Sequence, residues 1–247
     1  MAGAALQRRL TWLAAEVVET AEETPRVRTI QFDVPGWPGH RPGQHVDVRL
    51  TAEDGYQAQR SYSIASAPED DGIELTVELI EDGEVSGYLV EELRPGDSFE
   101  VRGPIGGYFV WEADDGGPVL LVAGGSGVVP FRSMLRHRAA AGSDAPATLV
   151  VSARTAEDLI YRSELEEIAS NGDGVRLLQT LTRGASEGWD GPTGRVSREL
   201  VAPLVEPDAR AFVCGPTGFV EAVADVLVEL GLDPAQVKTE RFGPTGG

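Results

Sequence analysis

A short polar segment near residue 60 carries the side chains that a nucleotide cofactor needs. It reads Gln59-Arg60-Ser61-Tyr62-Ser63-Ile64. If this segment is a strand, alternation places Arg60 and Tyr62 on one face and Ser61 and Ser63 on the other. A guanidinium suits a phosphate, an aromatic ring offers a stacking face, and a serine hydroxyl can reach a ring nitrogen. These side chains suit a flavin nucleotide, and a solvated strand end with ordinary polar residues is the alternative.

A glycine-rich loop provides a second candidate site further along the chain. The apolar run 119–123 leads into the loop residues Gly124, Gly125, Ser126, Gly127 and Pro130. Such a loop between a strand and a helix lets backbone amides approach a pyrophosphate without a Cβ in the way. It departs from the Rossmann pattern Gly-x-Gly-x-x-Gly, because Pro130 takes the last position. The loop therefore favours nucleotide binding without meeting the usual fingerprint.

The two segments together, in this order, resemble the ferredoxin–NADP reductase family of flavoproteins. Arg60 to Ser63 matches the family's Arg-x-Tyr-Ser flavin motif, and the glycine loop matches its form that ends in proline. The segment 83–89 is similar to the second flavin segment of the family, where Val85 and Ser86 begin a short helix that meets the pyrophosphate. A plain helix cap is the alternative for Ser86. The resemblance covers about residues 12–242.

Two further segments resemble the redox site of this family. Cys214-Gly215-Pro216 matches a tripeptide that lies beside the nicotinamide, and Glu240-x-Phe242 resembles the family's acidic–x–aromatic ending. The resemblance implies that Phe242 shields one flavin face. It also implies catalytic positions for Ser63, near flavin N5, and for Cys214 and Glu240, beside the hydride path. An ordinary core thiol and a frayed tail are the alternatives.

Three arginines suggest which coenzyme is used. Arg154, Arg183 and Arg195 follow the carboxyl ends of predicted strands, where an open α/β sheet binds its ligands. Each resembles a position that NADP-selective members fill with arginine, so the three guanidiniums are expected to converge on a 2′-phosphate. Chance placement is the alternative, because all basic residues but one are arginine, and Asp158 leaves NADH open. We predict FAD and NADPH as cofactors.

The composition excludes several classes of protein. A formal net charge of -19 argues against non-specific binding to nucleic acid or to anionic membranes. Cys214 is the only cysteine, so these residues form no internal disulfide and hold no four-thiolate iron–sulfur cluster. No signal peptide, membrane-spanning run or metal site is predicted. We expect a soluble, cytoplasmic monomer.

The hydrophobic pattern predicts two architectures in series. Strands are expected at 12–22, 26–33, 44–50, 56–64, 73–80 and 97–102, with a short helix at 86–92. In the fifth of these, Leu75 and Val77 alternate with Glu74, Thr76 and Glu78, which is typical of a half-buried strand. Six such strands at close spacing favour a small closed barrel.

Beyond a linker at 113–117 the pattern changes to alternating strands and helices. Strands are expected at 118–123, 147–153, 174–181, 210–214 and 236–241, and helices at 129–140, 161–170, 197–205 and 217–230. Nearly unbroken apolar strands are typical of a parallel sheet with helices on both faces. The prediction is a six-stranded antiparallel flavin-binding barrel, residues 1–113, followed by a parallel-sheet nucleotide-binding domain, residues 118–247.

The resemblance also implies a function and a partner. We expect an FAD-dependent reductase that takes hydride from NADPH and passes single electrons to a separate carrier, a [2Fe–2S] ferredoxin of an oxygenase system. A free-flavin or siderophore-iron reductase and a nucleotide-sensing module without turnover are the alternatives. A pyrimidine-pathway electron-transfer subunit would need a cysteine cluster. The expected docking surface is a local basic patch of Arg26, Arg28, Arg41, Arg132 and Arg136.

Overall fold

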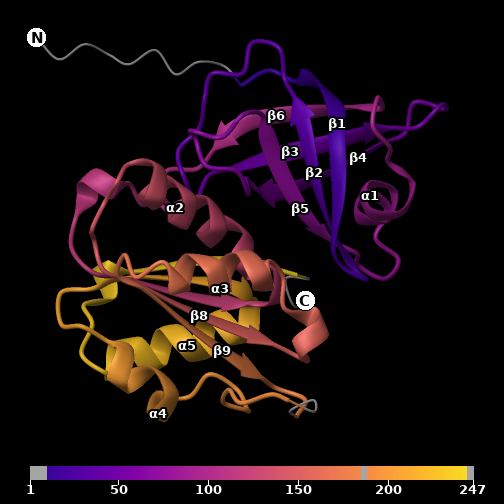
Figure 1. The fold of residues 1–247 in the computed structure, drawn as a ribbon. Helices are drawn as coiled ribbons and strands as arrows, with labels where there is room; N and C mark the ends of the chain where they lie inside the picture. The colour runs from indigo at the N-terminus through magenta and orange to yellow at the C-terminus, as the bar shows by residue number, and fades with distance from the viewer. Residues whose placement is uncertain (1–9, 185–187, 244–247) are drawn as a thin grey trace, which may run out of the picture.

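The N-terminal half of the chain folds as an antiparallel barrel. The computed structural model describes residues 10–184 and 188–243. Its first sheet has six strands in the order β4-β3-β6-β1-β2-β5 (Figure 1). They are β1 (Leu13–Thr24), β2 (Val27–Asp33), β3 (His45–Thr51), β4 (Gln57–Ser63), β5 (Ile73–Glu78) and β6 (Ser98–Ile105). An antiparallel bridge between Ile64 and Leu75 joins the two edge strands, which confirms the predicted barrel.

Apolar residues from all around the barrel fill its interior. Phe32 and Phe99 meet edge to face, with ring centroids 5.1 Å apart, and Leu75 is fully buried beside them. Helix α1 (Glu84–Gly87) begins two residues before the prediction and runs into a π-helical turn, Tyr88–Glu92. Its apolar residues pack into the same core, so this helix is fixed to the barrel.

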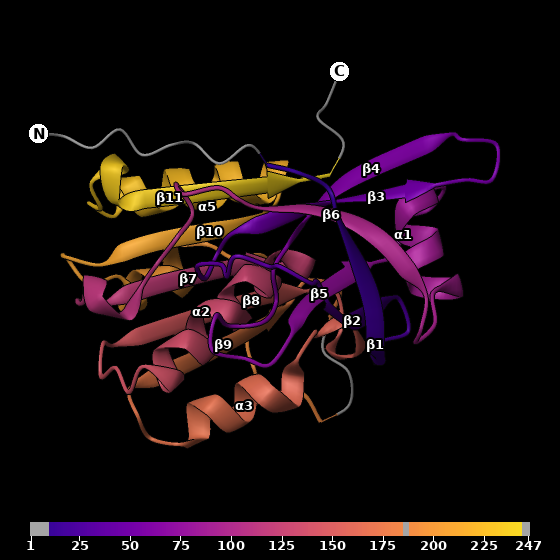
Figure 2. The same ribbon diagram turned by 90° about the horizontal axis from the view of Figure 1, so that it is seen from above.

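The C-terminal half carries a parallel sheet in the order β11-β10-β7-β8-β9. The strands are β7 (Val119–Gly124), β8 (Ala147–Ala153), β9 (Val175–Leu181), β10 (Arg210–Pro216) and β11 (Val237–Phe242). The strand order reverses between β7 and β10, so their carboxyl ends lie at the position where open α/β sheets bind ligands. Figure 2 shows this sheet beside the barrel.

Helices cover both faces of the parallel sheet, as predicted (Figure 1). They are α2 (Val129–Ala140), α3 (Arg162–Ser170), α4 (Arg198–Val201) and α5 (Thr217–Glu229). Helices α2 and α3 pack with Leu121 on one face, and α4 and α5 pack with Leu120 on the other. The helix predicted at 197–205 is shorter than expected, because Pro203 lacks an N–H and the chain continues as a 3₁₀ turn.

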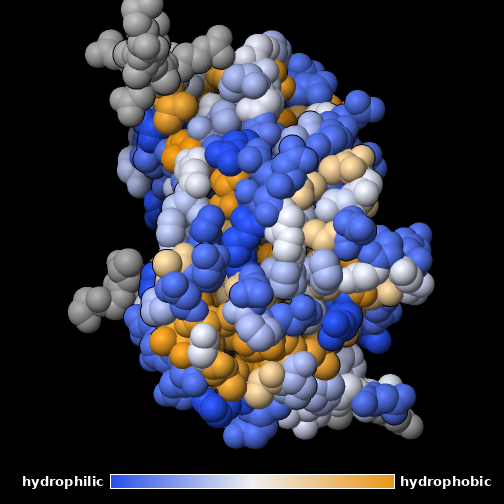
Figure 3. Space-filling model, turned by 90° about the vertical axis from the view of Figure 1, so that its left-hand side faces the viewer, coloured by the Kyte–Doolittle hydropathy of each residue, from blue (hydrophilic) through white to orange (hydrophobic). Residues whose placement is uncertain are grey.

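The predicted linker is held to the second sheet. Ala113–Asp115 forms a short 3₁₀ helix, and the Asp115 carboxylate pairs with Arg210 at 2.9 Å. The division of the chain into residues 1–113 and 118–247 stays a prediction. The face shown in Figure 3 is mostly hydrophilic, with apolar side chains gathered toward the parallel-sheet half. No helix in the described part of the chain is long and apolar enough to cross a membrane.

The polar face of β5 contacts the second half of the chain. Glu74, Thr76 and Glu78 alternate with the buried Leu75 and Val77. Each of the three contacts a different element. Their respective partners are Arg132 of α2, Tyr161 just before α3, and Ser126 of the glycine-rich loop. One strand of the barrel thus makes three consecutive contacts with the parallel-sheet half of the chain.

The contact at Glu74 is part of a buried ionic cluster. Arg132 is 5% exposed and donates to both Glu74 and Glu164, the latter at 2.8 Å. Arg136 pairs with Glu164 at 2.6 Å and with Asp70 at 3.0 Å. The prediction that Arg132 and Arg136 form an exposed docking patch is therefore wrong. They share a helix face as expected, but that face packs against the barrel.

The other arginines of the predicted patch also have partners. Arg26 donates to the Leu79 carbonyl at 2.8 Å and Arg28 to the Leu93 carbonyl at 3.4 Å. Arg41 forms a two-pronged ion pair with Glu112. In the described ranges, Arg41 is the one of these three that pairs with a carboxylate, and a docking role for Arg26 and Arg28 stays a prediction.

Candidate functional site

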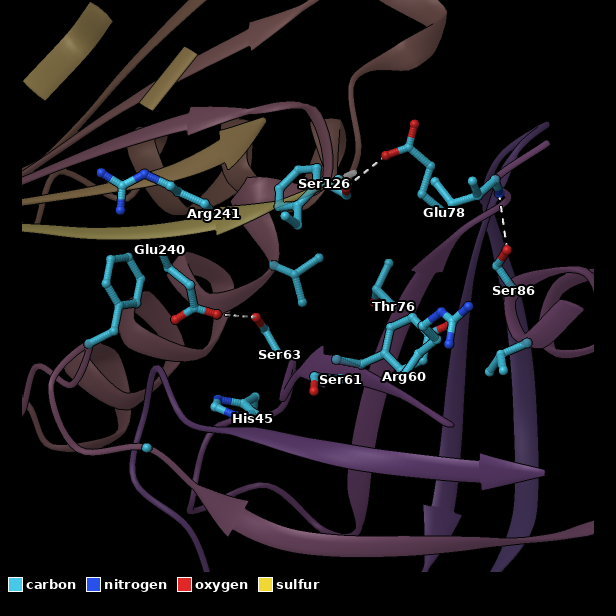
Figure 4. Close-up of a pocket in the computed structure, with 18 of the residues that line it drawn as sticks. His45, Arg60, Ser61, Ser63, Thr76, Glu78, Ser86, Ser126, Glu240 and Arg241 are labelled. Atoms are coloured by element: carbon cyan, nitrogen blue, oxygen red, sulfur yellow. Dashed lines mark hydrogen bonds between the residues drawn. The ribbon is translucent and has the colours of Figure 1, made fainter. Parts of the chain in front are cut away.

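A cavity of about 910 Å³ lies between the barrel and the parallel sheet. Its walls include many of the residues that the sequence singled out (Figure 4). They are Arg60, Ser61, Tyr62, Ser63, Val85, Ser86, Ser126, Glu240 and Phe242. The barrel strands, α1, the glycine-rich loop and β11 all contribute, so the cavity exists only where the two halves of the chain meet.

Strand β4 alternates as predicted, and residues from both of its faces, Arg60 to Ser63, line the cavity. Tyr62 pairs with the buried Val46, whereas Ser61 pairs with Asp47 on the other face. The Ser61 hydroxyl donates to Asp47 at 2.6 Å, and Arg102 donates to the same carboxylate. Burial raises the pKa of Asp47, but the bonds from Ser61 and Arg102 lower it more, so the carboxylate stays charged. Ser61 therefore serves as part of the strand's own support.

The three predicted catalytic residues are brought to one place. The Ser63 hydroxyl donates to Glu240 across the cavity at 3.4 Å (Figure 4). Cys214 lies opposite Glu240 in the register of β10 and β11, and it is 2% exposed. Burial raises the pKa of Glu240 to about 7, against the bond from Ser63. Burial and the Glu240 charge raise the pKa of the Cys214 thiol, which is therefore neutral and no nucleophile.

Helix α1 meets the cavity through its first turn. Val85 is buried, and the Ser86 hydroxyl accepts from the Ile80 amide at 3.1 Å and donates to the Gly83 carbonyl. The cap residue is Gly83, so the cap alternative for Ser86 does not apply. The hydroxyl is engaged within its own turn. What this turn offers to a ligand is its first backbone amides, which have no acceptor inside the helix.

The glycines after β7 and β10 are required by close packing between the two loops. A Cβ at Gly127 would lie 2.1 Å from the Cys214 carbonyl oxygen, and one at Gly124 or Gly215 would strike the Phe219 ring. Gly125 has a φ of +57° and open space beside it. Pro130 lies in the first turn of α2 and Pro216 precedes α5. The pairing of the two loops thus positions both predicted nucleotide segments at the reversal of strand order.

The three arginines predicted for the coenzyme follow β8 and β9. The Arg183 amide donates to the Arg154 carbonyl at 2.9 Å, so these two residues are neighbours. Thr193, two residues before Arg195, bridges to Leu181 at the end of β9. In the ranges 10–184 and 188–243, none of the three guanidiniums forms an ion pair. They lie outside the lining of the cavity, at the adjoining edge of the sheet.

Sequence reasoning missed several residues of the cavity wall. Thr76 and Glu78 reach it from β5, His45 from β3, and Tyr108, which is 62% exposed, from the loop after β6. Burial lowers the pKa of His45 below its usual value, so the ring is neutral. The alternation in β5 was the available signal for Thr76 and Glu78. It marks a polar face without indicating what that face contacts.

The residues present fit a flavin nucleotide. The cavity is within the size range of cofactor sites. Arg60 and the first amides of α1 are donors for a pyrophosphate, and Tyr62 and Phe242 are aromatic walls. Burial raises the pKa of Tyr62 to about 12, so this ring keeps its hydroxyl proton. The fold and the cavity define a protein that binds a flavin in a barrel and a second nucleotide on a parallel sheet.

Comparison with known proteins gives the family. Residues 14–110 match the model of the oxidoreductase FAD-binding domain, and residues 121–225 match that of the oxidoreductase NAD-binding domain. The chain is 36% identical to ferredoxin–NADP reductase B of Sorangium cellulosum, over 92% of this chain and 96% of that protein. It belongs to the ferredoxin–NADP reductase family of flavoprotein oxidoreductases.

Two other proteins are similar to most of this chain. The chain is 37% identical to the glycine betaine monooxygenase reductase subunit of Chromohalobacter salexigens, over 92% of this chain, and it spans 63% of that protein's length. The FAD/NAD-binding domain of a Vibrio cholerae nitric oxide dioxygenase superposes with a TM-score of 0.83 at 25% identity. That match covers 94% of this chain and 99% of the dioxygenase domain.

Proposed function

We propose that this chain takes hydride from NADPH onto an FAD held in the cavity and passes the electrons singly to a separate carrier. The observation that carries the proposal is the convergence of Ser63, Glu240 and Cys214 where the barrel meets the ends of β10 and β11. FAD, when bound, accepts two electrons as hydride and releases them one at a time. The chain's own contribution is to bind, orient and shield the reacting groups.

Each wall of the cavity has a distinct task in this proposal. Arg60 and the first turn of α1 hold the pyrophosphate, and Phe242 covers the ring face on the side of β11. Ser63 places a hydroxyl at the redox edge, and this hydroxyl donates to Glu240 until a ligand takes its hydrogen bond. With a pKa of about 7, Glu240 is able to take up or release a proton near neutral pH. Cys214 lies next to Glu240 on the neighbouring strand, outside the cavity lining, as a buried neutral thiol.

The arginines at the sheet edge support NADPH over NADH. Arg154 and Arg183 are joined through their backbones, and both side chains are exposed. The carboxylate of Asp158, which could otherwise bind a ribose, accepts instead from the Thr155 amide and hydroxyl at 3.0 and 2.8 Å. An exposed pair of guanidiniums that forms no ion pair within residues 10–184 and 188–243 suits a 2′-phosphate.

A small iron–sulfur protein serving an oxygenase is the proposed electron acceptor. The relatives that support this are the reductase subunit of glycine betaine monooxygenase and a ferredoxin–NADP reductase. The single cysteine means that these 247 residues hold no four-thiolate cluster of their own. A free-flavin or ferric-siderophore reductase is the second candidate. Tyr108, exposed at the cavity rim, belongs to a wall open enough to admit a small acceptor.

The test of the flavin and hydride steps is a visible spectrum of the purified protein. We expect bound flavin absorption that bleaches when NADPH is added without oxygen, and reoxidation by a [2Fe–2S] ferredoxin faster than by free flavin or ferric chelates. The opposite order of acceptors would favour the second candidate. Absence of bleaching with both NADPH and NADH would leave a nucleotide-sensing module.

The test of coenzyme choice is the double variant Arg154→Ala with Arg183→Ala. Only NADPH carries the 2′-phosphate, so its KM should rise by about tenfold or more, while the KM for NADH should change little. Arg176→Ala, an exposed arginine on β9 of the same domain, is the matched control. A wild-type protein that prefers NADH would mean that these arginines are ordinary loop residues.

A further inference from the structure

One contact across the cavity joins the barrel directly to the glycine-rich loop. The Ser126 hydroxyl donates to the Glu78 carboxylate at 2.7 Å. Both residues are half-buried and both line the cavity, and Figure 4 shows the bond spanning from β5 to the loop after β7. Glu78 is the last residue of β5, so its backbone is fixed by the pairing of that strand with β2.

The partner of the Glu78 carboxylate at this contact is a neutral hydroxyl. In the described part of the chain no cation pairs with this carboxylate, whereas Glu74 on the same face pairs with Arg132. The loop of Gly125 to Gly127 follows a parallel strand and precedes a helix, which is the arrangement that binds the pyrophosphate of a dinucleotide. The Glu78 carboxylate thus accepts the hydroxyl hydrogen bond of Ser126, in a loop that is suited to an anionic ligand.

We propose that Glu78 competes with the coenzyme pyrophosphate for this loop and so weakens coenzyme binding. This inference rests on the proposed function, in which the loop binds NAD(P)H. Two negative groups at one loop repel each other, and the repulsion is strong where the surroundings exclude water. Coenzyme binding must therefore turn the Glu78 carboxylate away from Ser126, and coenzyme release lets the bond form again. Glu78 is a positioning residue of the empty loop that sets coenzyme affinity.

The experiment uses Glu78→Gln in the FAD-loaded protein. Glutamine has nearly the same shape and still accepts from Ser126, but it removes the negative charge. We expect the Kd of NADP⁺, measured by the change in flavin absorption, to fall about tenfold. The KM for NADPH should fall by a similar factor, and the rate constant of flavin reduction at saturating NADPH should stay within about twofold. A merely structural role would not tighten binding.

Two further variants make the test specific. Glu91→Gln removes the same charge from an exposed turn of the barrel, and its coenzyme affinity should equal that of the wild type. In a Ser126→Ala background, where the hydrogen bond is already absent, the gain from Glu78→Gln should shrink to about threefold or less. If Glu78→Gln fails to hold FAD, Glu78→Asp, whose carboxylate is withdrawn from the loop by one methylene, should tighten NADP⁺ binding about threefold.

Unchanged or weaker NADP⁺ binding in Glu78→Gln would overturn the inference. Equal tightening in Glu91→Gln would also overturn it, because the cause would then be the net charge of the protein. The proposed function fails separately, if neither NADPH nor NADH reduces the flavin of the wild-type protein.

Discussion

The two ends of β5 contact the nucleotide-binding half in different ways. At one end, Glu74 meets Arg132, a guanidinium that is 5% exposed and that also binds Glu164. At the other end, Glu78 meets the neutral hydroxyl of Ser126 beside the cavity. The first contact pairs opposite charges away from water, and the second pairs a charge with a small dipole. We infer that the Glu74 contact is permanent, whereas the Glu78 contact is exchangeable, that is, it can be replaced by a contact with a ligand.

The difference shows how the domains keep their relative position while ligands come and go. Separating a buried ion pair leaves an uncompensated charge and is strongly unfavourable. A hydroxyl–carboxylate bond next to a cavity can be replaced by bonds to water or to a ligand at small net cost. We infer that the Glu74 end fixes the angle between the barrel and the parallel sheet. The bond at the Glu78 end can be released when the loop binds its nucleotide.

Removing the charge at the fixed end should have the largest effect. Arg132→Met keeps much of the side-chain volume but removes the more deeply buried of the two guanidiniums that pair with Glu74 and Glu164, and it leaves them with Arg136. We expect the free energy of unfolding to fall by about 3–5 kcal/mol, measured by urea denaturation. The matched control is Arg162→Met, because Arg162 forms an exposed pair with Glu166 and should contribute less than about 1 kcal/mol. Similar losses in both variants would mean that the Arg132 cluster is not special.

Glu240 should make stability depend on pH in a defined direction. Burial raises its pKa in the folded protein to about 7 from the usual 4.5, so the folded state binds more protons than the unfolded state between these values. Its contribution is fully present below the lower value and is lost as pH rises through the higher one. Relative to Glu240→Gln, the wild type should lose up to about 3 kcal/mol across this window.

The measurement is urea unfolding of the flavin-free wild type and of Glu240→Gln at several pH values. The comparison between the two proteins cancels the opposite trend of His40 and His45, whose pKa values burial lowers. A difference that does not vary with pH would mean that the Glu240 carboxyl is hydrated in solution.

Arg60→Ala tests the part of the cavity that belongs to the barrel strand β4, away from the contact between Glu78 and Ser126. Loss of a charge-assisted bond to the pyrophosphate should weaken FAD binding by about 1.5–3 kcal/mol, or roughly tenfold to hundredfold. The purified variant should be nearly colourless and partly reconstituted by excess FAD. Gln57→Ala, on the same strand but outside the cavity, should keep its colour. Full colour in Arg60→Ala would assign the phosphate to other donors.

The sequence predicted elements well and contacts between domains poorly, for physical reasons. Hydrophobic alternation and apolar runs located nearly every strand, because burial on one or both faces leaves a direct pattern. The period of α2 also placed Arg132 and Arg136 together on one face. It could not tell that β5 would cover that face, since water and a partner domain both favour polar residues. The polar face of β5 was ambiguous for the same reason.

In the candidate site, too, local patterns could be predicted from the sequence, and contacts between distant residues could not. Arg60, Tyr62 and Ser63 could be assigned to one site because their types and spacing suit one ligand, and all three line the cavity. The bond from Ser63 to Glu240 joins residues that are far apart in the chain, and the raised pKa of Glu240 depends on burial between the two halves. Glu78 gave no signal of its own, because a glutamate at the end of a strand is ordinary until its neighbour is known.

The middle contact of β5 offers the smallest and most discriminating test. The buried Tyr161 hydroxyl donates to Thr76, which also shares a hydrogen bond with Thr29 at 2.8 Å. Tyr161→Phe keeps the ring over which Arg132 lies, so it removes only this hydroxyl. Because Thr76 retains Thr29, we expect a loss of about 0.5–1.5 kcal/mol in unfolding free energy and an unchanged KM for NADPH. A loss as large as that of Arg132→Met would mean that the Thr76 contact, like the Glu74 contact, holds the two halves together permanently. A changed KM for NADPH would instead mean that the Thr76 contact, like the Glu78 contact, responds to coenzyme binding.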